Sequence, residues 1–345
     1  MAAAGARVKG PITDAHRFCR TPRLVVRRSP GILGGVPDRV LMPLFVALWT
    51  SGYVVGAVAL GVADPLPVLA VRFLLASLLA VPLALRRGRW RGAPLGRLAV
   101  VGVFLQVLQF GGAYGGLSLG VPAALVALVM LGLSPLITTG LAVATGQERA
   151  DGRLWAGLAV GVAGVAISLA PELGSARAGA GVLVTLVAVA GLAGGTVLQK
   201  RWVRAADPIV SLAVQSVTAA LVLAPAAAIA GGRFDVSLRL VLSMAWIGWG
   251  MGLVSLGVFV RILQRHAAST AAALLLLVPP VTAIVSAPVL GQALHPASLA
   301  GMLVALAGVW VVLRRAAPAR AAEHQAVTAS SAACRAPATS ASSLP

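Results

Sequence analysis

The chain has 345 residues, of which 59% are hydrophobic and 11% are charged, whereas soluble domains are about 45–50% apolar and about 25% charged. This composition excludes a water-soluble enzyme of this size, and two cysteines exclude both a disulfide framework and a cysteine-based zinc cluster. The net charge of +19 would suggest nucleic-acid binding in a soluble protein, but the distribution of the charges argues against it.

Long apolar stretches follow one another along the chain. A helix that crosses a bilayer needs about 20 mostly apolar residues, because about 30 Å of hydrocarbon is spanned at about 1.5 Å per residue. Ten stretches meet this requirement; none contains Asp or Glu, and Arg72 is the one basic residue well inside them. We therefore predict an all-α polytopic membrane protein with ten transmembrane helices, at residues 41–61, 66–85, 97–117, 121–143, 154–170, 180–199, 208–230, 240–260, 268–290 and 296–313.

The positions of Lys and Arg predict the orientation of these helices. If the N-terminus is inside, the cytoplasmic segments hold 24 of the 28 Lys and Arg residues and the outer loops hold three. This split agrees with the excess of basic residues in cytoplasmic loops. We therefore expect a multi-pass protein of the inner (cytoplasmic) membrane with both termini in the cytoplasm. Its positive charge is expected to contact anionic lipids of the bilayer and not nucleic acid.

Both ends of the chain lack the apolar residues of a folded core. Residues 1–39 are basic and contain no apolar stretch typical of a secretory signal, and residues 315–345 are rich in Ala, Ser, Thr and Pro. We expect residues 1–39 to form a disordered cytoplasmic leader and residues 315–345 to form a disordered cytoplasmic tail.

The sequence contains an internal repeat of five helices, at 40–171 and 178–314. The two units share Asp-Pro pairs, prolines and glycines at offsets of 143 to 145 residues. The matched positions are Asp64-Pro65 with Asp207-Pro208, Pro135 with Pro280, Gly146-Gln147 with Gly291-Gln292, Gly157 with Gly301, and Gly164 with Gly308. Because five is odd, the second unit enters the membrane from the opposite side, and such inverted repeats are typical of alternating-access transporters.

In its motifs and their order the chain resembles the EamA-type drug/metabolite transporters, whose pattern is two five-helix EamA repeats. The resemblance lies in Leu48-Trp49-Thr50-Ser51-Gly52, Arg72-Phe73, Pro135, Gly146-Gln147-Glu148-Arg149, Pro280, Gly291-Gln292 and Gly301. It departs at Gln292, where the family usually has Glu. The resemblance implies a secondary transporter of small metabolites or drugs, often an exporter, and it leaves the substrate open.

Arg72 is the strongest candidate for substrate binding. An arginine at the centre of a membrane helix costs about 2.5–3.5 kcal/mol on insertion scales and normally faces protein or water. We predict that Arg72 lines a cavity and contacts an anionic or carboxylate-bearing part of a small-molecule substrate. The alternatives are that it extends to the outer headgroups or pairs with Asp64. Its counterpart in the second unit is Gln215, which we expect to face it across the pseudo-two-fold axis.

Further cavity candidates occur as pairs at helical spacing. Gln106 and Gln109 share one helix face, and at membrane depth they either face a wet cavity or bind neighbouring helices. The aromatic pairs either line a cavity or serve as packing and interface residues. These pairs are Trp49 with Tyr53 and Trp246 with Trp249.

Two prolines and a glycine-rich helix suggest how the helices move and pack. Pro135 and Pro280 interrupt equivalent helices, and each removes one backbone hydrogen bond. They are hinge candidates at the interface of the repeats, with static kinks as the alternative. The glycines of 154–170 form a face that lets helices approach closely, within one subunit or across a homodimer.

An intramembrane serine hydrolase is the alternative from another class, because Gly116-Leu117-Ser118-Leu119-Gly120 fits the G-x-S-x-G nucleophile elbow. The elbow requires a strand before the serine and a histidine base within reach, whereas Ser118 ends an apolar stretch and the four histidines lie in tails or at membrane boundaries. We therefore predict that the protein is not an enzyme. No metal-binding or ATP-binding motif is present, so we expect no cofactor and energy from a gradient, by proton antiport, exchange or facilitated flux.

Overall fold

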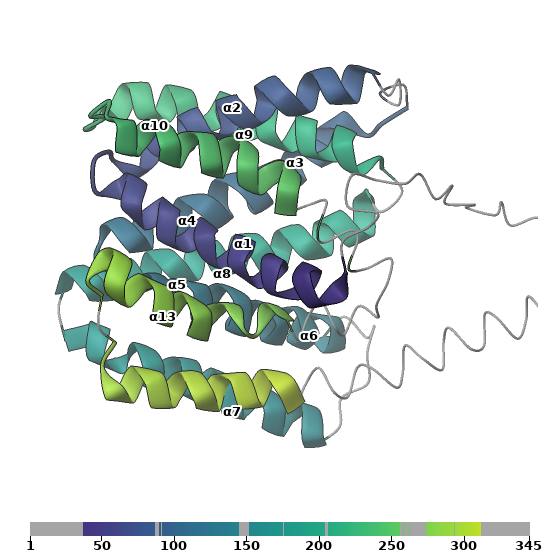
Figure 1. The fold of residues 1–345 in the computed structure, drawn as a ribbon. Helices are drawn as coiled ribbons and strands as arrows, with labels where there is room; N and C mark the ends of the chain where they lie inside the picture. The colour runs from purple at the N-terminus through teal and green to yellow at the C-terminus, as the bar shows by residue number, and fades with distance from the viewer. Residues whose placement is uncertain are drawn as a thin grey trace, which may run out of the picture. The chain divides into compact units, whose positions relative to one another are not determined.

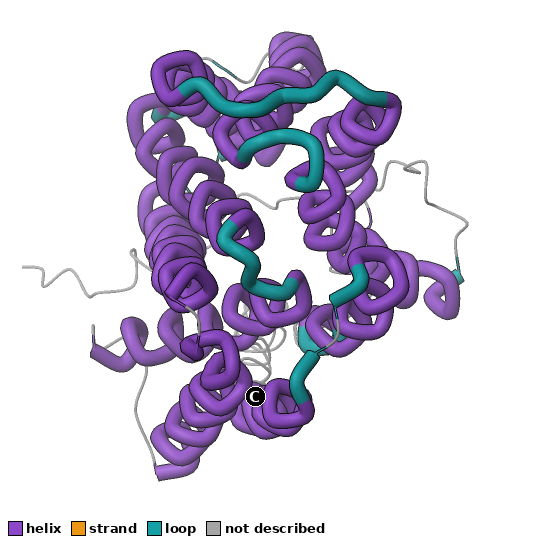
Figure 2. The backbone as a smooth tube through the Cα atoms, turned by 90° about the vertical axis from the view of Figure 1, so that its left-hand side faces the viewer, coloured by secondary structure: helices purple, strands orange, loops and turns teal. Residues whose placement is uncertain are grey.

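The structure is a computed structural model that describes residues 37–86, 90, 92–144, 152–174, 176–203, 206–255, 258, 262, 274–292 and 294–311. Within these residues the regular secondary structure is helical, apart from an isolated bridge between Ala63 and Phe234. Figures 1 and 2 show helices that run roughly alongside one another and are joined by loops. The predicted tail, and the predicted leader up to residue 36, lie outside the described residues.

The first half of the chain forms five apolar crossings. They are α1 (Asp38–Leu60), α2 (Pro65–Arg86), α3 (Leu95–Gly102) continued by η1 (Val103–Leu108) and α4 (Gln109–Ser118), α5 (Ala123–Leu128) continued by η2 (Val129–Leu133) and α6 (Ser134–Ala144), and α7 (Gly152–Leu169) with the short η3 (Ala170–Gly174). Helix α1 begins at Asp38, so the last residues of the predicted leader belong to the first crossing.

The second half adds five more crossings. They are α8 (Ala176–Trp202), α9 (Pro208–Ala230), α10 (Leu238–Ala245) continued by η4 (Trp246–Ser255), α13 (Val278–Leu290) and the last helix, Pro296–Val311. Across the described residues, six helices are long and apolar enough to cross a membrane, and four shorter apolar helices complete the set. The prediction of an all-α polytopic membrane protein with ten helices is confirmed.

Contacts between the two repeats come in symmetry-related pairs. Helix α2 packs against its own counterpart α9, and α5 packs against its counterpart α13. Helix α4 in the third crossing of the first repeat packs against α8, the first crossing of the second repeat. The symmetry-equivalent contact, between α1 of the first repeat and α10 and η4 of the second, is also present. A two-fold relation between the repeats requires both contacts, because each contact between two elements must recur with the two repeats interchanged. The fold therefore follows the inverted repeat in the sequence.

Helix α7 and the last helix cross at very close range because both carry glycines at the contact. A methyl group at Gly164 would lie 2.6 Å from the Cα atom of Ala305, and one at Gly301 would lie 2.7 Å from the carbonyl oxygen of Gly164. The Oγ–H of Ser168 donates to the carbonyl of Ser298 at 2.9 Å. The small-residue face of 154–170 thus packs within the subunit.

The repeated Asp-Pro pair has a different structural role in each repeat. In the second, Asp207 caps α9, because its Oδ1 accepts from the backbone N–H of Ile209 at 2.9 Å. In the first, the Oδ2 of Asp64 accepts from the backbone N–H of Arg233 at 2.7 Å, and the N–H of Asp64 donates to the carbonyl of Arg233 at 2.8 Å. Asp64 therefore joins the loop before α2 to the loop before α10, on the side that the charge pattern assigns to the outside.

Irregular helix segments occupy equivalent places in the two repeats. The π-helical segments η1 and η4 interrupt the third and the eighth crossing at matched positions. Segment η2 ends at Leu133, two residues before Pro135, and a turn at 276–277 directly precedes α13, which carries Pro280 in its first turn. The crossing predicted at 268–290 is thus divided by a turn, and Pro279 and Pro280 fall in the first turn of α13, where proline costs no helical hydrogen bond.

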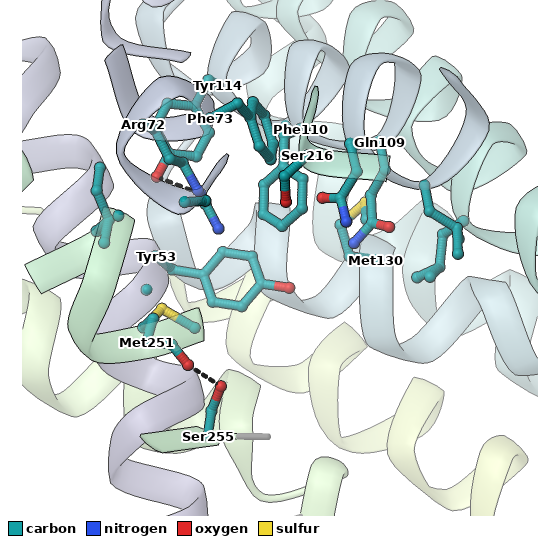
Figure 3. A pocket seen from close by; sticks show the side chains of 18 of the residues that line it. Tyr53, Arg72, Phe73, Gln109, Phe110, Tyr114, Met130, Ser216, Met251 and Ser255 are labelled. Atoms are coloured by element: carbon teal, nitrogen blue, oxygen red, sulfur yellow. Dashed lines mark hydrogen bonds between the residues drawn. The ribbon is translucent and has the colours of Figure 1, made fainter. Parts of the chain in front are cut away.

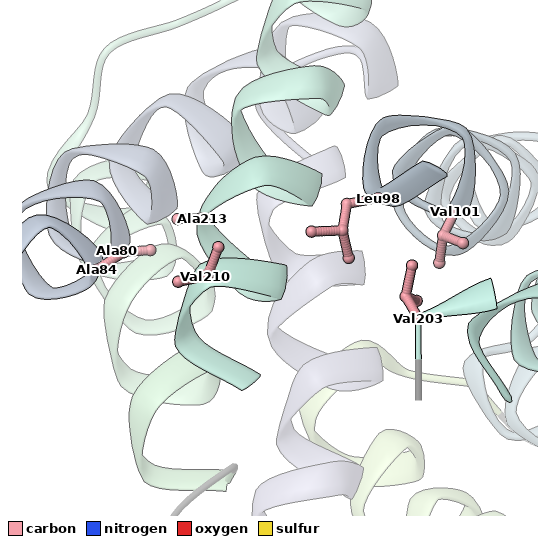
Figure 4. Packing of buried hydrophobic residues seen from close by; sticks show 7 residues of the cluster. All are labelled: Ala80, Ala84, Leu98, Val101, Val203, Val210 and Ala213. Atoms are coloured by element: carbon pink, nitrogen blue, oxygen red, sulfur yellow. The ribbon is translucent and has the colours of Figure 1, made fainter. Parts of the chain in front are cut away.

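Small apolar side chains pack the helix ends that the charge pattern assigns to the cytoplasmic side. Alanines and valines allow α2, α3 and α9 to approach one another there, as Figure 4 shows. The buried members of this apolar cluster are Ala80, Ala84, Leu98, Val101, Val203, Val210 and Ala213. Together with the loop contact at Asp64, it joins the repeats at both ends of the cavity described next.

Candidate functional site

A cavity of about 380 Å³ lies between the two repeats, midway along the helices. This volume is within the range of about 300–1,000 Å³ that is usual for small-molecule sites. Its wall is formed by α1, α2, η1, α4 and η2 of the first repeat and by α8, α9 and η4 of the second. The three π-helical segments found in the described parts of the chain, η1, η2 and η4, therefore all contribute to the wall, and π-helical insertions are frequent at functional sites.

Arg72 of α2 lies in the wall of this cavity with 8% of its surface exposed. Its Nη1–H donates to the hydroxyl of Tyr114 at 3.0 Å, and its Cζ lies 3.9 Å from the centroid of the Phe110 ring. Figure 3 shows the guanidinium beside these rings and above Tyr53. Among the described residues no carboxylate pairs with Arg72, and Asp64 contacts Arg233 instead.

Aromatic rings hold the guanidinium in place. Phe73 and Phe110 meet edge to face with centroids 5.7 Å apart, and Phe110 and Tyr114 do so at 6.4 Å. Tyr114 fits because the facing residue on α1 is Gly56, where a methyl group would lie 2.8 Å from the Tyr114 hydroxyl. A cation on a ring face gains up to about 2 kcal/mol when it is desolvated, so this packing offsets part of the cost of burying the charge.

Four further sequence candidates also lie in the cavity wall. Gln106 of η1 and Gln109 of α4 share a face, and Figure 3 shows the Gln109 amide across the cavity from Arg72. Trp49 and Tyr53 of α1 line the cavity as well, and the buried indole N–H of Trp49 has no hydrogen-bond partner among the described residues. An unpaired buried donor costs about 1–3 kcal/mol, and an oxygen atom of a bound ligand would relieve that cost.

Three sequence candidates lie outside the cavity lining. The Nε2–H of Gln215, on the buried face of α9, donates to Oε1 of Gln199 at 3.0 Å, so its amide is used within the second repeat. The indole N–H of Trp246 donates to the hydroxyl of Ser51 at 2.9 Å, and that of Trp249 donates to the carbonyl of Leu75 at 2.9 Å. Both tryptophans are partly exposed on the outer face of the helices and join η4 to α1 and α2.

The sequence reasoning missed several residues of the wall, above all Phe110 and Tyr114. Both follow Gln106 by multiples of four residues, at four and eight positions along the chain, so they lie close to the helix face that carries Gln106 and could have been predicted to line the same cavity. Met130, Ser216 and Met251 also contribute, as Figure 3 shows. Ser216 directly follows Gln215, which the sequence analysis singled out, whereas Met130 and Met251 are apolar residues in apolar stretches and gave no polar signal.

The two hinge candidates lie beside irregular segments and not in the cavity wall itself. Pro135 follows η2, whose Met130 does line the cavity. Pro280 lies in the first turn of α13, after the turn at 276–277. Both prolines therefore mark places where a regular helix is interrupted, and whether these segments bend during transport stays a prediction.

Ser118 lies in a setting unlike a nucleophile elbow. It is the last residue of α4, and its hydroxyl donates to the carbonyl of Gly115 at 2.8 Å. The glycines of the motif have packing reasons instead: Gly116 faces Thr185 of α8 with no room for a side chain, and Gly120 turns the chain with φ of +96°. Because a helix and not a strand precedes Ser118, the motif here is a close helix contact followed by a tight turn.

The chain is similar to two curated bacterial proteins. A "probable amino-acid metabolite efflux pump" of Salmonella typhimurium (strain LT2) and one of Escherichia coli (strain K12) are each 27% identical to it over 285 residues, which cover 79% of this chain and 94% of the relative. A solved structure, described as a crystal structure of a protein, shares the fold with a TM-score of 0.55. It has 16% identity, and the match covers 79% of this chain and 96% of that chain.

The sequence profile of the EamA-like transporter family matches residues 40–170 and 179–314. The two matches follow one another, as the internal repeat predicted, and together they cover well over half of the chain. The resemblance drawn from the motifs is thereby confirmed. This multi-pass membrane protein with its two sets of five helices belongs to the EamA-like transporter family.

Proposed function

We propose that this protein exports small, carboxylate-bearing metabolites from the cytoplasm across the inner membrane, by alternating access and with both termini in the cytoplasm. The observation that carries the proposal is the guanidinium of Arg72, which is buried in the wall of a cavity between the repeats without a carboxylate partner among the described residues. The relatives named as amino-acid metabolite efflux pumps support both the direction and the size of the substrate.

The chemistry of the wall suits a carboxylate. A guanidinium presents donors in a planar fork that matches the two oxygens of a carboxylate, which a lysine ammonium cannot do. In Arg72 one face is covered by Phe110 and Nη1 is bound to Tyr114. The group is therefore fixed in orientation before a ligand arrives, which lowers the entropy cost of binding.

Alternating access requires contacts between the repeats that can be exchanged. The Asp64–Arg233 contact joins them on the predicted outer side, and the apolar cluster around Val210 joins them on the predicted cytoplasmic side. Rocking of one repeat against the other would open one of these ends while the other stays closed. The cavity lies between the two contacts, where a substrate would be held during the exchange.

The test is untargeted metabolite profiling of the growth medium from a deletion strain that carries the wild-type protein, Arg72→Gln or Arg239→Gln. Arg239 is a matched control, because it is an exposed arginine outside the cavity. We expect metabolites with a carboxylate to accumulate in the medium with the wild-type protein and with Arg239→Gln. With Arg72→Gln, at equal amounts of protein in the membrane, their concentration in the medium should fall at least about tenfold, because losing one charged hydrogen-bonding partner costs at least about 1.5 kcal/mol.

The same assay can contradict the proposal in two ways. Equal export by the wild type and Arg72→Gln would show that Arg72 does not contact the substrate. No difference in any metabolite between the deletion strain and the wild-type protein would remove the support for export itself. Arg72→Lys is expected to lie between the wild type and Arg72→Gln, because it keeps the charge and loses the planar fork.

A further inference from the structure

We infer that this transporter selects substrates with a net charge of −1 over zwitterionic amino acids, and that the membrane potential, and not a proton gradient, drives their export. The inference rests on the proposed function and adds the charge of the substrate and the source of the energy.

The described wall of the cavity carries a fixed positive charge and no negative one. Among its described lining residues Arg72 is the sole charged side chain, and arginine stays protonated in proteins. The sequence contains nine Asp and Glu residues, none of them within a predicted crossing. A ligand of charge −1 therefore makes the occupied cavity neutral, whereas an uncompensated buried charge is costly.

An amino acid would fit this cavity less well than its N-acylated form. With its carboxylate on Arg72, the α-ammonium would lie a few ångströms from the guanidinium without a carboxylate among the described wall residues to pair with it. The Phe110 ring face, which could have received a cation, already holds Arg72 at 3.9 Å. In the cavity wall Gln106 and Gln109 offer amide groups, which suit an uncharged amide or hydroxyl. Like charges in contact lower the affinity for the wrong ligand.

The charged and titratable residues of the cavity wall also indicate the source of the energy. Proton-coupled transporters carry Asp, Glu or His within the membrane, and the described helices hold none of these in the cavity wall. Each cycle that exports one anion moves one negative charge out of a cell whose interior is negative. This movement is favourable, and a potential of ~100 mV supports about a 50-fold concentration ratio for one charge. Because the occupied cavity is neutral, this charge moves in the return step, in which the empty cavity carries its positive charge inward with the potential.

The experiment uses the full chain in liposomes and three probes that share one aromatic ring. N-acetyl-phenylalanine carries charge −1, phenylalanine is zwitterionic, and phenylalaninamide carries charge +1. A potassium gradient with valinomycin makes the lumen positive, so uptake imitates export from a negative cytoplasm. A pH gradient without a potential is imposed in parallel, and protein-free liposomes give the passive leak. The variants are Arg72→Gln, its matched control Arg239→Gln, and Gln109→Glu, which adds a carboxylate to the wall.

We expect N-acetyl-phenylalanine to enter at least about tenfold faster than phenylalanine, to accumulate up to about 50-fold at ~100 mV, and to be indifferent to the pH gradient. Arg72→Gln should lose the preference for the anion, Arg239→Gln should keep it, and Gln109→Glu should shift it toward phenylalanine because the new carboxylate pairs with the ammonium.

The outcomes separate the inference from the proposed function. Uptake of phenylalanine as fast as that of its N-acetyl form, or accumulation that follows the pH gradient and not the potential, would overturn the inference while transport itself stands. If none of the probes enters faster than in protein-free liposomes, both the inference and the proposed carboxylate export are contradicted. If Arg72→Gln does not reach the membrane, Gln109→Glu tests the inference, because that variant keeps Arg72. A preference that does not shift toward phenylalanine in Gln109→Glu would then overturn the inference.

Discussion

At the scale of single residues, the described part of the chain stabilises a buried cation with aromatic rings and a hydroxyl, and no acidic side chain within it pairs with that cation. Placing an arginine in a membrane helix costs about 2.5–3.5 kcal/mol. A desolvated cation–π contact contributes up to about 2 kcal/mol, and a hydrogen bond to a charged group contributes about 1.5–3 kcal/mol. The contacts of Arg72 with Phe110 and Tyr114 are thus of the size needed to offset its burial. A carboxylate partner within the protein would neutralise the positive charge that we expect to bind the substrate.

The Tyr114 hydroxyl can be tested by its removal. Tyr114→Phe takes away the acceptor that fixes Nη1 of Arg72, so the guanidinium becomes less well oriented. We expect the flux at low substrate concentration to fall about fivefold, which corresponds to about 1 kcal/mol, with KM raised and the amount of protein in the membrane unchanged. Measured flux per membrane protein checks this result.

The matched control is Tyr53→Phe, because the second tyrosine of the chain also lies in the cavity wall and has no hydrogen bond to Arg72 among the described contacts. Its effect on KM should be smaller. Equal KM values for Tyr114→Phe and the wild type would mean that the bond between Tyr114 and Arg72 does not orient the guanidinium for binding.

At the scale of helices, close packing depends on residues that have no side chain. Gly308 of the last helix lies directly against the backbone of Gly161 on α7, so Gly308→Ala must push the two helices apart. We expect a loss of about 1–3 kcal/mol of stability, as for other overpacked sites. Thermal unfolding in detergent, followed by fluorescence or size-exclusion chromatography, measures the change.

Gly179→Ala on α8 is the control for this prediction. It makes the same change inside a helix, at a position where a methyl group meets nothing within 4 Å. It should leave the midpoint of unfolding unchanged or raise it, because alanine is the better helix former by about 0.5–1 kcal/mol. If Gly308→Ala also raised the midpoint, the contact between the two helices would not be as close as the structure shows.

The loops on the predicted outer side offer a second test at this scale. Asp64→Asn replaces a charge-assisted bond to the Arg233 backbone by a weaker one. We expect the outer contact between the repeats to open more often. A cysteine placed in the cavity by Ser216→Cys should then react several times faster with a membrane-impermeant thiol reagent added from outside, since charge-assisted bonds are about twice as strong as neutral ones.

Asp235→Asn is the matched control for the loop. The Arg233–Asp235 pair has a distance of 3.7 Å, and its side chains are 52% and 65% exposed, so it contributes about 0–1 kcal/mol. Its loss should leave the labelling rate nearly unchanged. A rate that rises equally in both variants would assign the effect to the net charge of the loop and not to the bond at Asp64.

At the scale of the whole molecule, the two halves are related by their contacts and by their irregularities. The paired contacts of α2 with α9 and of α5 with α13 place equivalent elements opposite each other. The π-helical segments η1 and η4 also lie at matched positions and both line the cavity. The site therefore includes the irregular segments of the third and the eighth crossing, and irregular backbone within a membrane is tolerated where it is buried in protein or lines a cavity.

The orientation in the membrane is a prediction for the whole molecule. Reporter fusions after Arg91, Lys200 and Arg315 should report the cytoplasm, and fusions after Asp64, Arg177 and Asp235 should report the outside, because 24 of the 28 basic residues then lie inside. A reporter that is active outside when fused after Arg91 would reverse the orientation. It would also place the Asp64 contact on the cytoplasmic side.

The sequence by itself determined the ten helices, their repeat and the face that carries Gln106 and Gln109. These features follow from hydropathy, from constant offsets and from the helical period, each of which is local or one-dimensional. The same reasoning singled out Arg72, because a charge inside an apolar stretch is rare whatever surrounds it.

Only the tertiary structure decided which candidates share a cavity. The aromatic pair Trp49 and Tyr53 lines it, whereas the similar pair Trp246 and Trp249 joins helices on the outer face. Gln215 has the predicted repeat position but binds Gln199, a neighbour on another helix. A helical period shows which residues share a face, but it does not show what covers that face. That depends on the packing of helices distant in sequence, and glycines at their contacts set how closely they approach.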